Sequence, residues 1–231
     1  MDLVCEFRYW NWLEIGSEYT STISSSSIQE PNTIIQKING KHLDGKSDKD
    51  VESIWFSNTT VNYFPQGLNK IFPNLKAVGI HNCGLKSITR RDLDGLENIQ
   101  ILWCSKNKIA SLPDNLFRNM NKLNAISFRD NDLQFMSSEV LMPILKNGLK
   151  LVDFRRNRSI DAVYCDSSYT QKINGNKVDS LVQLMAMIFE KCDKPNKKDE
   201  QTLSNKKLQD IKTEGFNELW TTGRFSDITI V

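Results

Sequence analysis

The chain has 231 residues, of which 39% are apolar and 25% charged, and its formal net charge is +2. Such a balance of charges disfavours a dedicated nucleic-acid-binding protein, and no apolar run approaches the ~20 residues that span a bilayer. The length allows one domain or two. Cysteines are odd in number and widely spaced, which disfavours a disulfide framework and a zinc site; they are Cys5, Cys83, Cys104, Cys165 and Cys192.

Residues 1–48 begin with an aromatic-rich stretch that runs from Phe7 to Tyr19. Residues 21–27, STISSSS, are typical of a loop or a polar strand edge. Residues 34–43, IIQKINGKHL, predict a strand that ends in a turn at Asn39-Gly40. We expect residues 1–48 to form a β cap at the N-terminal end of the fold.

Residues 98–112, NIQILWCSKNKIASL, fit the pattern L-x-x-L-x-L-x-x-N-x-L-x-x-L. Equivalent apolar positions recur with offsets of 24, 24, 24 and 26 residues, in copies that begin at Val51, Leu75, Ile99, Leu123 and Leu149. The pattern resembles leucine-rich repeats. It implies an α/β leucine-rich-repeat solenoid over residues 49–165, with a curved parallel sheet, short convex helices, an N-terminal β cap and a C-terminal helical cap.

The ninth position of each copy is expected to bond backbone groups of the neighbouring turn, because an amide carries both donors and acceptors. Asn107, Asn131 and Asn157 fit this role, while Thr59 and Cys83 are weaker substitutes. The outer halves of the repeats, such as RDLDGLEN and DNLFRNMNK, predict one or two helical turns. A longer helix is expected over 137–148, where the two extra residues fall.

Side chains between the inward positions of each strand should form the concave face. They make three columns: Ser53, Ala77, Ile101, Ala125, Leu151; Trp55, Gly79, Trp103, Ser127, Asp153; and Ser57, His81, Ser105, Arg129, Arg155. Two indoles beside a shallow dip, with arginines at one end, favour a protein-binding face. The predicted contact residues are Trp55, Gly79, His81, Ile101, Trp103, Ser105, Ser127, Arg129, Asp153 and Arg155. The alternative is that a terminus or loop covers the indoles.

The residue types in several segments, as well as the spacing of the repeats, resemble those of insect leucine-rich-repeat proteins over about residues 5–165. The resemblance rests on Cys5, the W-x-x-I-G-x-x-Y stretch at 12–19, the segment from Ile35 to Lys46, and the phrase NGLKLVDFRRNRSIDAVYC. Members of this family usually carry a second cysteine just after the Tyr-Thr pair. This chain has Ser21 there, so the resemblance implies that Cys5 has lost its disulfide partner.

After Cys165 the repeat pattern ends. Residues 166–178 read as a loop, and VDSLVQLMAMIFEKC predicts an amphipathic helix that closes the stack within a cap at 166–192; a partner-binding helix is the alternative. Residues 193–213 are rich in charges of both signs and fit a solvated linker. The tail from 214 to 231 includes FSDITIV after a short helical pattern, and it resembles the opening of a BTB/POZ domain. That resemblance implies a homodimer and recruitment of a cullin ubiquitin ligase through a complete domain.

No catalytic, cofactor-binding or metal-binding motif is present, so we expect no enzyme activity and no cofactor. His81 lacks a recognisable triad and is best explained as a polar residue of the concave face. The leading hypothesis is a cytoplasmic scaffold that binds a partner protein, since no signal peptide is visible. The alternative is a secreted or cell-surface recognition protein. Its support is two N-glycosylation sequons, at Asn58-Thr59-Thr60 and Asn157-Arg158-Ser159.

Overall fold

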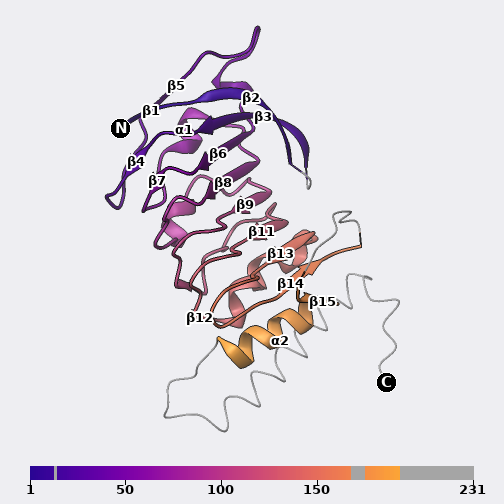
Figure 1. Cartoon of the computed structure of the whole chain (residues 1–231). Helices are drawn as coiled ribbons and strands as arrows, with labels where there is room; N and C mark the ends of the chain where they lie inside the picture. The colour runs from indigo at the N-terminus through magenta and orange to yellow at the C-terminus, as the bar shows by residue number, and fades with distance from the viewer. Residues whose placement is uncertain (13–14, 168–174, 193–231) are drawn as a thin grey trace.

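A computed structural model describes residues 1–12, 15–167 and 175–192 (Figure 1). Its strands are β1 Asp2–Val4, β2 Glu6–Trp12, β3 Gly16–Ile23, β4 Ser27–Ile28, β5 Lys37–Asn39, β6 Ser53–Ser57, β7 Thr60–Val61, β8 Ala77–His81, β9 Ile101–Trp103, β10 Ser111–Leu112, β11 Ala125–Ser127, β12 Phe135–Met136, β13 Leu151–Asp153, β14 Val163–Cys165 and β15 Lys177–Val178. The α-helices are α1 Leu68–Ile71 and α2 Leu181–Lys191, and short 3₁₀ helices cover Asp48–Asp50, Arg90–Leu93 and Ser138–Asn147. The predicted linker at 193–213 and the BTB-like tail at 214–231 lie outside the described residues.

The architecture is mixed α/β, with one large sheet and few helices. Nine strands follow one another in the order β15-β14-β13-β11-β9-β8-β6-β3-β2, and Figure 1 shows them descending from the N-terminal hairpin to α2. The strands from β3 to β13 are parallel, whereas β2 and β14 run antiparallel to their neighbours β3 and β13. An antiparallel strand therefore stands at each end of a parallel stack.

The repeat offsets reappear as the register of the sheet. Ser53 pairs with Ala77, Ala77 with Ile101, and Ile101 with Ala125, which are three steps of 24 residues. Ala125 then pairs with Leu151, the step of 26. We call the five strands β6, β8, β9, β11 and β13 the repeat stack.

The turns opposite the sheet contain less α-helix than the sequence predicts. RDLDGLEN forms only the 3₁₀ turn Arg90–Leu93, and DNLFRNMNK forms turns with i to i+3 bonds, such as Leu116 N–H to the Pro113 carbonyl at 3.0 Å. The helix expected at 137–148 is a 3₁₀ helix that contains Pro143. Proline cannot donate the bond that an α-helix needs at this point, and the tighter winding suits short connections.

The N-terminal end of the stack is covered by the β2–β3 hairpin, whose strand β3 pairs with β6. Phe7 and Tyr19 are buried there, and the Phe7 ring stacks on the imidazole of His42 at 3.8 Å between centroids. Burial raises the pKa of the Cys5 thiol, and the nearby Ser21 hydroxyl lowers it. The position at which the family resemblance expects a second cysteine therefore does lie beside Cys5.

The C-terminal end is closed by more than the predicted helix. Two further strands, β14 and β15, extend the sheet beyond the repeats, and α2 packs against both strands and against the 3₁₀ helix at 138–147. The Ser180 hydroxyl caps α2 by accepting the Gln183 N–H at 3.1 Å. The apolar side of α2 is buried and consists of Leu181, Leu184, Met185 and Ile188.

The main core lies between the sheet and the turns, and the inward repeat positions fill it from Val51 to Phe154. Cys83 and Cys104 are buried in it as small apolar side chains. A second apolar cluster lies on the side of the sheet that faces away from the turns. We call this side the outer face; it carries the three outward columns that the sequence predicts to form the concave face. The buried members of the second cluster are Trp12, Ala77, Ile101, Ala125, Leu151, Val163 and Cys165.

Candidate functional site: the outer face of the sheet

The three predicted outward columns differ in exposure. The first column is buried, because Ile101 and Leu151 are at most 1% exposed and belong to the second apolar cluster. Trp55 and Trp103 in the second column are half-buried and pack against the same cluster. Five predicted contact residues are therefore buried supports of this face, not open surface: Gly79, Ile101, Ser105, Ser127 and Asp153.

An aromatic group occupies the N-terminal end of the outer face. The Trp55 ring stacks with Trp10 at 6.2 Å and with His81 at 5.6 Å between centroids, and it meets Trp12 edge-on at 5.5 Å. The Arg8 guanidinium lies 4.9 Å from the Trp10 ring centre. Both tryptophans that join Trp55 come from β2, so the N-terminal hairpin partly covers one of the two predicted indoles.

The predicted dip over Ala77 and Gly79 is filled. A Cβ atom built on Gly79 would lie 2.0 Å from Cε3 of Trp55, so the indole rests directly on the glycine backbone. Glycine is needed here for this close approach, since a methyl group would occupy the space of the ring. Trp103 lies in the same column, and no such packing with another ring is seen for it among the described residues.

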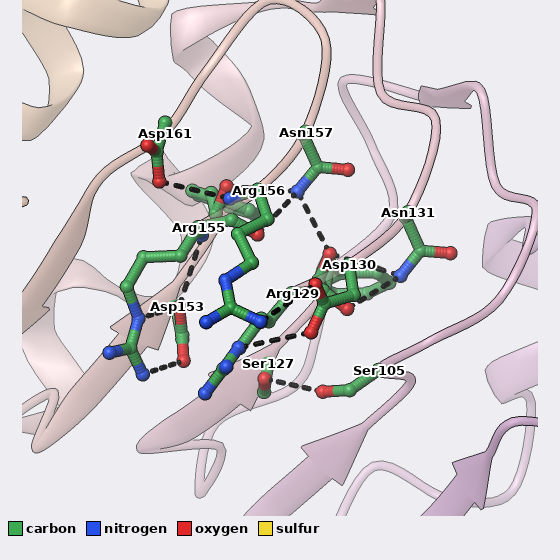
Figure 2. A network of polar contacts seen from close by, with 12 residues as sticks. Ser105, Ser127, Arg129, Asp130, Asn131, Asp153, Arg155, Arg156, Asn157 and Asp161 are labelled. Carbon is green, nitrogen blue, oxygen red and sulfur yellow. Dashed lines mark hydrogen bonds and ion pairs between the residues drawn. The ribbon is translucent and has the colours of Figure 1, made fainter. Parts of the chain in front are cut away.

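A polar network occupies the other end of the outer face (Figure 2). Arg155 contacts Asp153 through Nε at 2.9 Å and through a terminal nitrogen at 2.6 Å. Asp130 accepts Arg129 Nε at 3.1 Å and lies 3.5 Å from Arg156. The bidentate bond to Asp153 and the bond to Asp130 orient Arg155 and Arg129, whereas the Arg156 side chain is 64% exposed and only approaches Asp130.

Two hydroxyl groups near this network are hydrogen-bonded to each other (Figure 2). The hydroxyl oxygens of Ser105, two residues after β9, and of Ser127, at the end of β11, lie 2.7 Å apart, and both residues are nearly fully buried. His81 lies between the aromatic group and this network, and burial lowers its pKa, with nearby Lys106 acting in the same direction. Its imidazole is therefore neutral at pH 7, and its place is that of a polar member of the face.

Three asparagines bridge successive repeats as predicted. The Asn107 side-chain oxygen accepts the Cys83 and Leu85 N–H groups at 3.1 Å, and its nitrogen donates to the Ile80 carbonyl at 2.7 Å. Asn131 and Asn157 make the equivalent bonds one and two repeats later, with Ile109 N–H and Leu133 N–H as their donors. These side chains fix the strand ends from which the outer-face residues project.

A charged cluster on the sheet edge was not found from the sequence. Lys76 Nζ lies 2.7 Å from Glu52 and 3.3 Å from Glu18, whose side chain is 7% exposed. Burial raises the pKa of Glu18 to about 7, and its hydrogen bond with Glu52 contributes in the same direction. The available signal was a charged residue directly before β6 and β8, but Glu18 comes from β3, which is adjacent to β6 in the sheet and far from it in the sequence.

Two surface grooves lie away from the outer face. One, of about 520 Å³, is beside the Glu18 cluster and is lined by Tyr9, Tyr19, Lys46, Lys49, Asp50, Glu52, Pro73, Asn74, Leu75, Lys76, Asn98, Gln100 and Lys122. The other, of about 500 Å³, lies between β10, β12 and Cys192, beside the exposed ring of Phe135. Within the described residues, no three potential ligands are placed to hold a metal ion, and neither helix is long and apolar enough to cross a bilayer.

No protein-family model and no curated protein sequence matches the chain. Among solved structures, the chain is similar to the Toll–Spatzle complex, described as a molecular hub in Drosophila development and innate immunity. In its glycosylated form, the match has a TM-score of 0.45 and 19% identity, and it covers 56% of this chain and 17% of the other. A second structure of that complex gives a TM-score of 0.39 and 16% identity over 58% of this chain and 19% of the other.

Proposed function

We propose that the chain is a leucine-rich-repeat solenoid whose outer face binds a partner protein without catalysis. The observation that carries this proposal is the composition of that face: one half-buried tryptophan at its N-terminal end, one at its centre, and a rim of oriented arginines at the other end. Aromatic and arginine side chains held in place by their neighbours are typical centres of protein–protein interfaces, because little entropy is lost when they bind.

Within this proposal Trp103 is the leading contact residue. It is half-buried at the centre of the stack, next to the Ser105–Ser127 pair, whereas Trp55 is already engaged with the hairpin. Arg129, which Asp130 orients, and the exposed Arg156 beside it supply the polar side of the contact. His81 completes the predicted face between the two ends, while Ser105 is buried and supports it.

The test is site-specific photo-crosslinking on the full chain. A photoreactive phenylalanine derivative at Trp103 or at Arg156 should capture the same partner, while the probe at the exposed Arg118 should not. Trp103→Ala should abolish capture from position 156, with its urea midpoint measured in parallel. Capture that survives the substitution, or that is equal from position 118, would exclude the outer face as the binding site.

We extend the proposal to the tail, on sequence resemblance alone. Leu219, Phe225, Ser226 and Asp227 resemble the start of a BTB/POZ domain, which would add self-association and a cullin ubiquitin ligase to the partners of a cytoplasmic scaffold. Sequencing the transcript beyond codon 231 tests this, since the reading frame either continues into the rest of that domain or does not.

The alternative proposal is a secreted or cell-surface recognition protein, and one observation favours it. Asn58, the acceptor of the first sequon, is exposed on a turn. Mass spectrometry of the protein from its natural source distinguishes the two compartments: a glycosidase-sensitive mass supports export, and its absence supports the cytoplasmic scaffold.

A further inference from the structure

The two sequons of this chain occupy opposite structural environments. Asn58 follows β6 and Asn157 follows β13, and each begins an Asn-x-Ser/Thr triplet. An N-linked glycan is attached to the side-chain nitrogen Nδ2, so the surroundings of that atom decide whether the folded protein tolerates it.

Nδ2 of Asn157 uses both of its hydrogens in bonds to backbone carbonyl groups of two repeats. It donates to the carbonyl oxygens of Phe128 at 3.0 Å and Phe154 at 2.9 Å, while the side-chain oxygen accepts the Leu133 N–H at 3.1 Å. Both hydrogens of the amide are thus directed into the protein between two repeats. A sugar on this nitrogen would have to displace the neighbouring turn.

Nδ2 of Asn58 faces a different environment. Its one contact within the described residues is local, to the hydroxyl of Ser57 at 3.0 Å, and the side chain is exposed. The side-chain oxygen accepts Asn82 Nδ2 at 2.7 Å, which holds the amide in place without using its nitrogen. A glycosylated amide keeps one N–H and its oxygen, so both contacts can persist.

The rest of the first sequon has an exposed hydroxyl residue but is held through its backbone, because Thr60 pairs with Ser27 of β4 and its N–H donates to the Ser26 carbonyl at 3.3 Å. Thr60, which supplies the required hydroxyl two residues later, is exposed, and Asn58 has φ of +54°, which turns the chain outward after the strand. Asparagine adopts this left-handed conformation at little cost. Thr59, in contrast, is tied to Ser26 at 2.6 Å, but the middle residue of a sequon makes no direct contribution to it.

We propose that Asn58 is an N-glycosylation site of the folded chain and that Asn157 is a structural residue excluded from this modification. In the transfer, Asn58 Nδ2 forms a bond to C1 of a lipid-linked oligosaccharide pyrophosphate, the bond from C1 to the phosphate oxygen breaks, and one amide proton leaves with the lipid pyrophosphate. This inference rests on the alternative proposed function, a secreted or cell-surface protein, because the chain meets the lipid-linked oligosaccharide only in a secretory compartment; it does not depend on the identity of the partner protein.

The position of the glycan has a consequence for the outer face. Asn58 lies directly beyond Ser57 and pairs with Asn82, which follows His81. A sugar chain there would cover the rim beside β6 and β8 and leave the arginine rim at β11 and β13 open. Glycosylation would thus confine a partner to the end of the face that carries Trp103 and Arg129.

The test compares glycan transfer to Asn58 and to Asn157 in the folded and in the unfolded chain. The purified, folded full chain is incubated with a single-subunit oligosaccharyltransferase and a lipid-linked oligosaccharide, and the same reaction is run on chain unfolded in urea and diluted at once into the assay. Tryptic peptides are then read by mass spectrometry. We expect glycan on Asn58 in both samples and on Asn157 in the unfolded sample only.

Two variants serve as matched controls. Thr60→Ala should abolish modification of the folded chain, and Ser159→Ala should leave it unchanged, because each removes one sequon without altering its asparagine. Modification of Asn157 in the folded chain, or an unmodified Asn58 in either sample, would overturn the proposal. Loss of partner capture at position 103, in contrast, bears only on the proposed binding function.

Discussion

Single amide side chains join neighbouring repeats, and their removal should be costly. Asn131→Ala would leave the Ile109 N–H without its partner and would remove one of the two side-chain donors of the Cys104 and Phe128 carbonyls, which keep Asn107 and Asn157. One buried N–H left unpaired, together with two weakened carbonyl contacts, predicts a loss of about 2 kcal/mol in the free energy of unfolding. Urea denaturation of Asn131→Ala against the exposed control Asn121→Ala measures it. Equal midpoints for the two variants would contradict the bridging role.

The Glu18 carboxyl should make stability depend on pH. Its pKa is raised from 4.5 to about 7 in the folded state, so between these values the folded chain holds a proton that the unfolded chain has released. Stability should therefore be greatest near pH 4.5 and fall as pH rises to about 7. Below that window the lowered pKa of Glu52, which is hydrogen-bonded to Glu18, acts in the opposite sense.

Glu18→Gln provides the matching measurement, since the amide imitates the protonated acid. Urea midpoints at pH 5 and pH 8 should differ less for this variant than for the wild type, and at pH 8 the variant should be the more stable of the two. A wild-type chain that loses no more stability than Glu18→Gln between these pH values would exclude the proposed titration.

At this scale the sequence predicted the direction of side chains better than their exposure. The alternation of side chains along a strand predicted that Ile101 and Asp153 lie on the outer face. Both do lie there, but both are buried. Alternation says which way a side chain leaves the sheet, whereas exposure depends on what lies over it. Trp103 packs on the second apolar cluster, to which Ile101 belongs, and Arg155 is hydrogen-bonded to Asp153. Neither contact follows from the repeat pattern.

At the scale of elements, the packing of the Trp55 ring of β6 against the backbone of β8 depends on one glycine, Gly79. Gly79→Ala would place a methyl group 2.0 Å from Trp55 Cε3, and the indole would have to leave its stack with Trp10 and His81. Overpacking of this kind predicts a loss of about 2 kcal/mol. In a Trp55→Ala background the same substitution should be nearly neutral, and a double-mutant cycle by urea denaturation tests this coupling. Additive effects would mean that the ring does not rest on the glycine.

Strands were predicted more successfully than the elements that connect them. Five strands repeat one apolar pattern and pair in the register that this pattern sets. The connections have no such common pattern, and each adopts the turn that its length and its prolines allow. The closing strands β14 and β15 were missed because each is only two or three residues long and neither repeats an earlier segment.

For the whole molecule, the stack should tolerate the loss of one complete repeat. Ala77 and Ala125 both pair with Ile101, so deletion of residues 99–122 brings Ala125 into the place of Ile101. Asn131 would then meet the Cys83 and Leu85 N–H groups that Asn107 now binds. Because each repeat contacts only its neighbours, the shortened chain should fold cooperatively with a lower midpoint.

A shorter deletion should do more harm. Removal of residues 111–122 keeps β9 and β11 but leaves nine residues between Trp103 and Ala125. Parallel neighbouring strands need a connection of about a dozen residues or more, so this chain could not place both strands in the sheet. Circular dichroism during urea denaturation compares the two. A half-repeat deletion that folds as well as the full-repeat deletion would show that a complete repeat is not the unit from which this molecule is built.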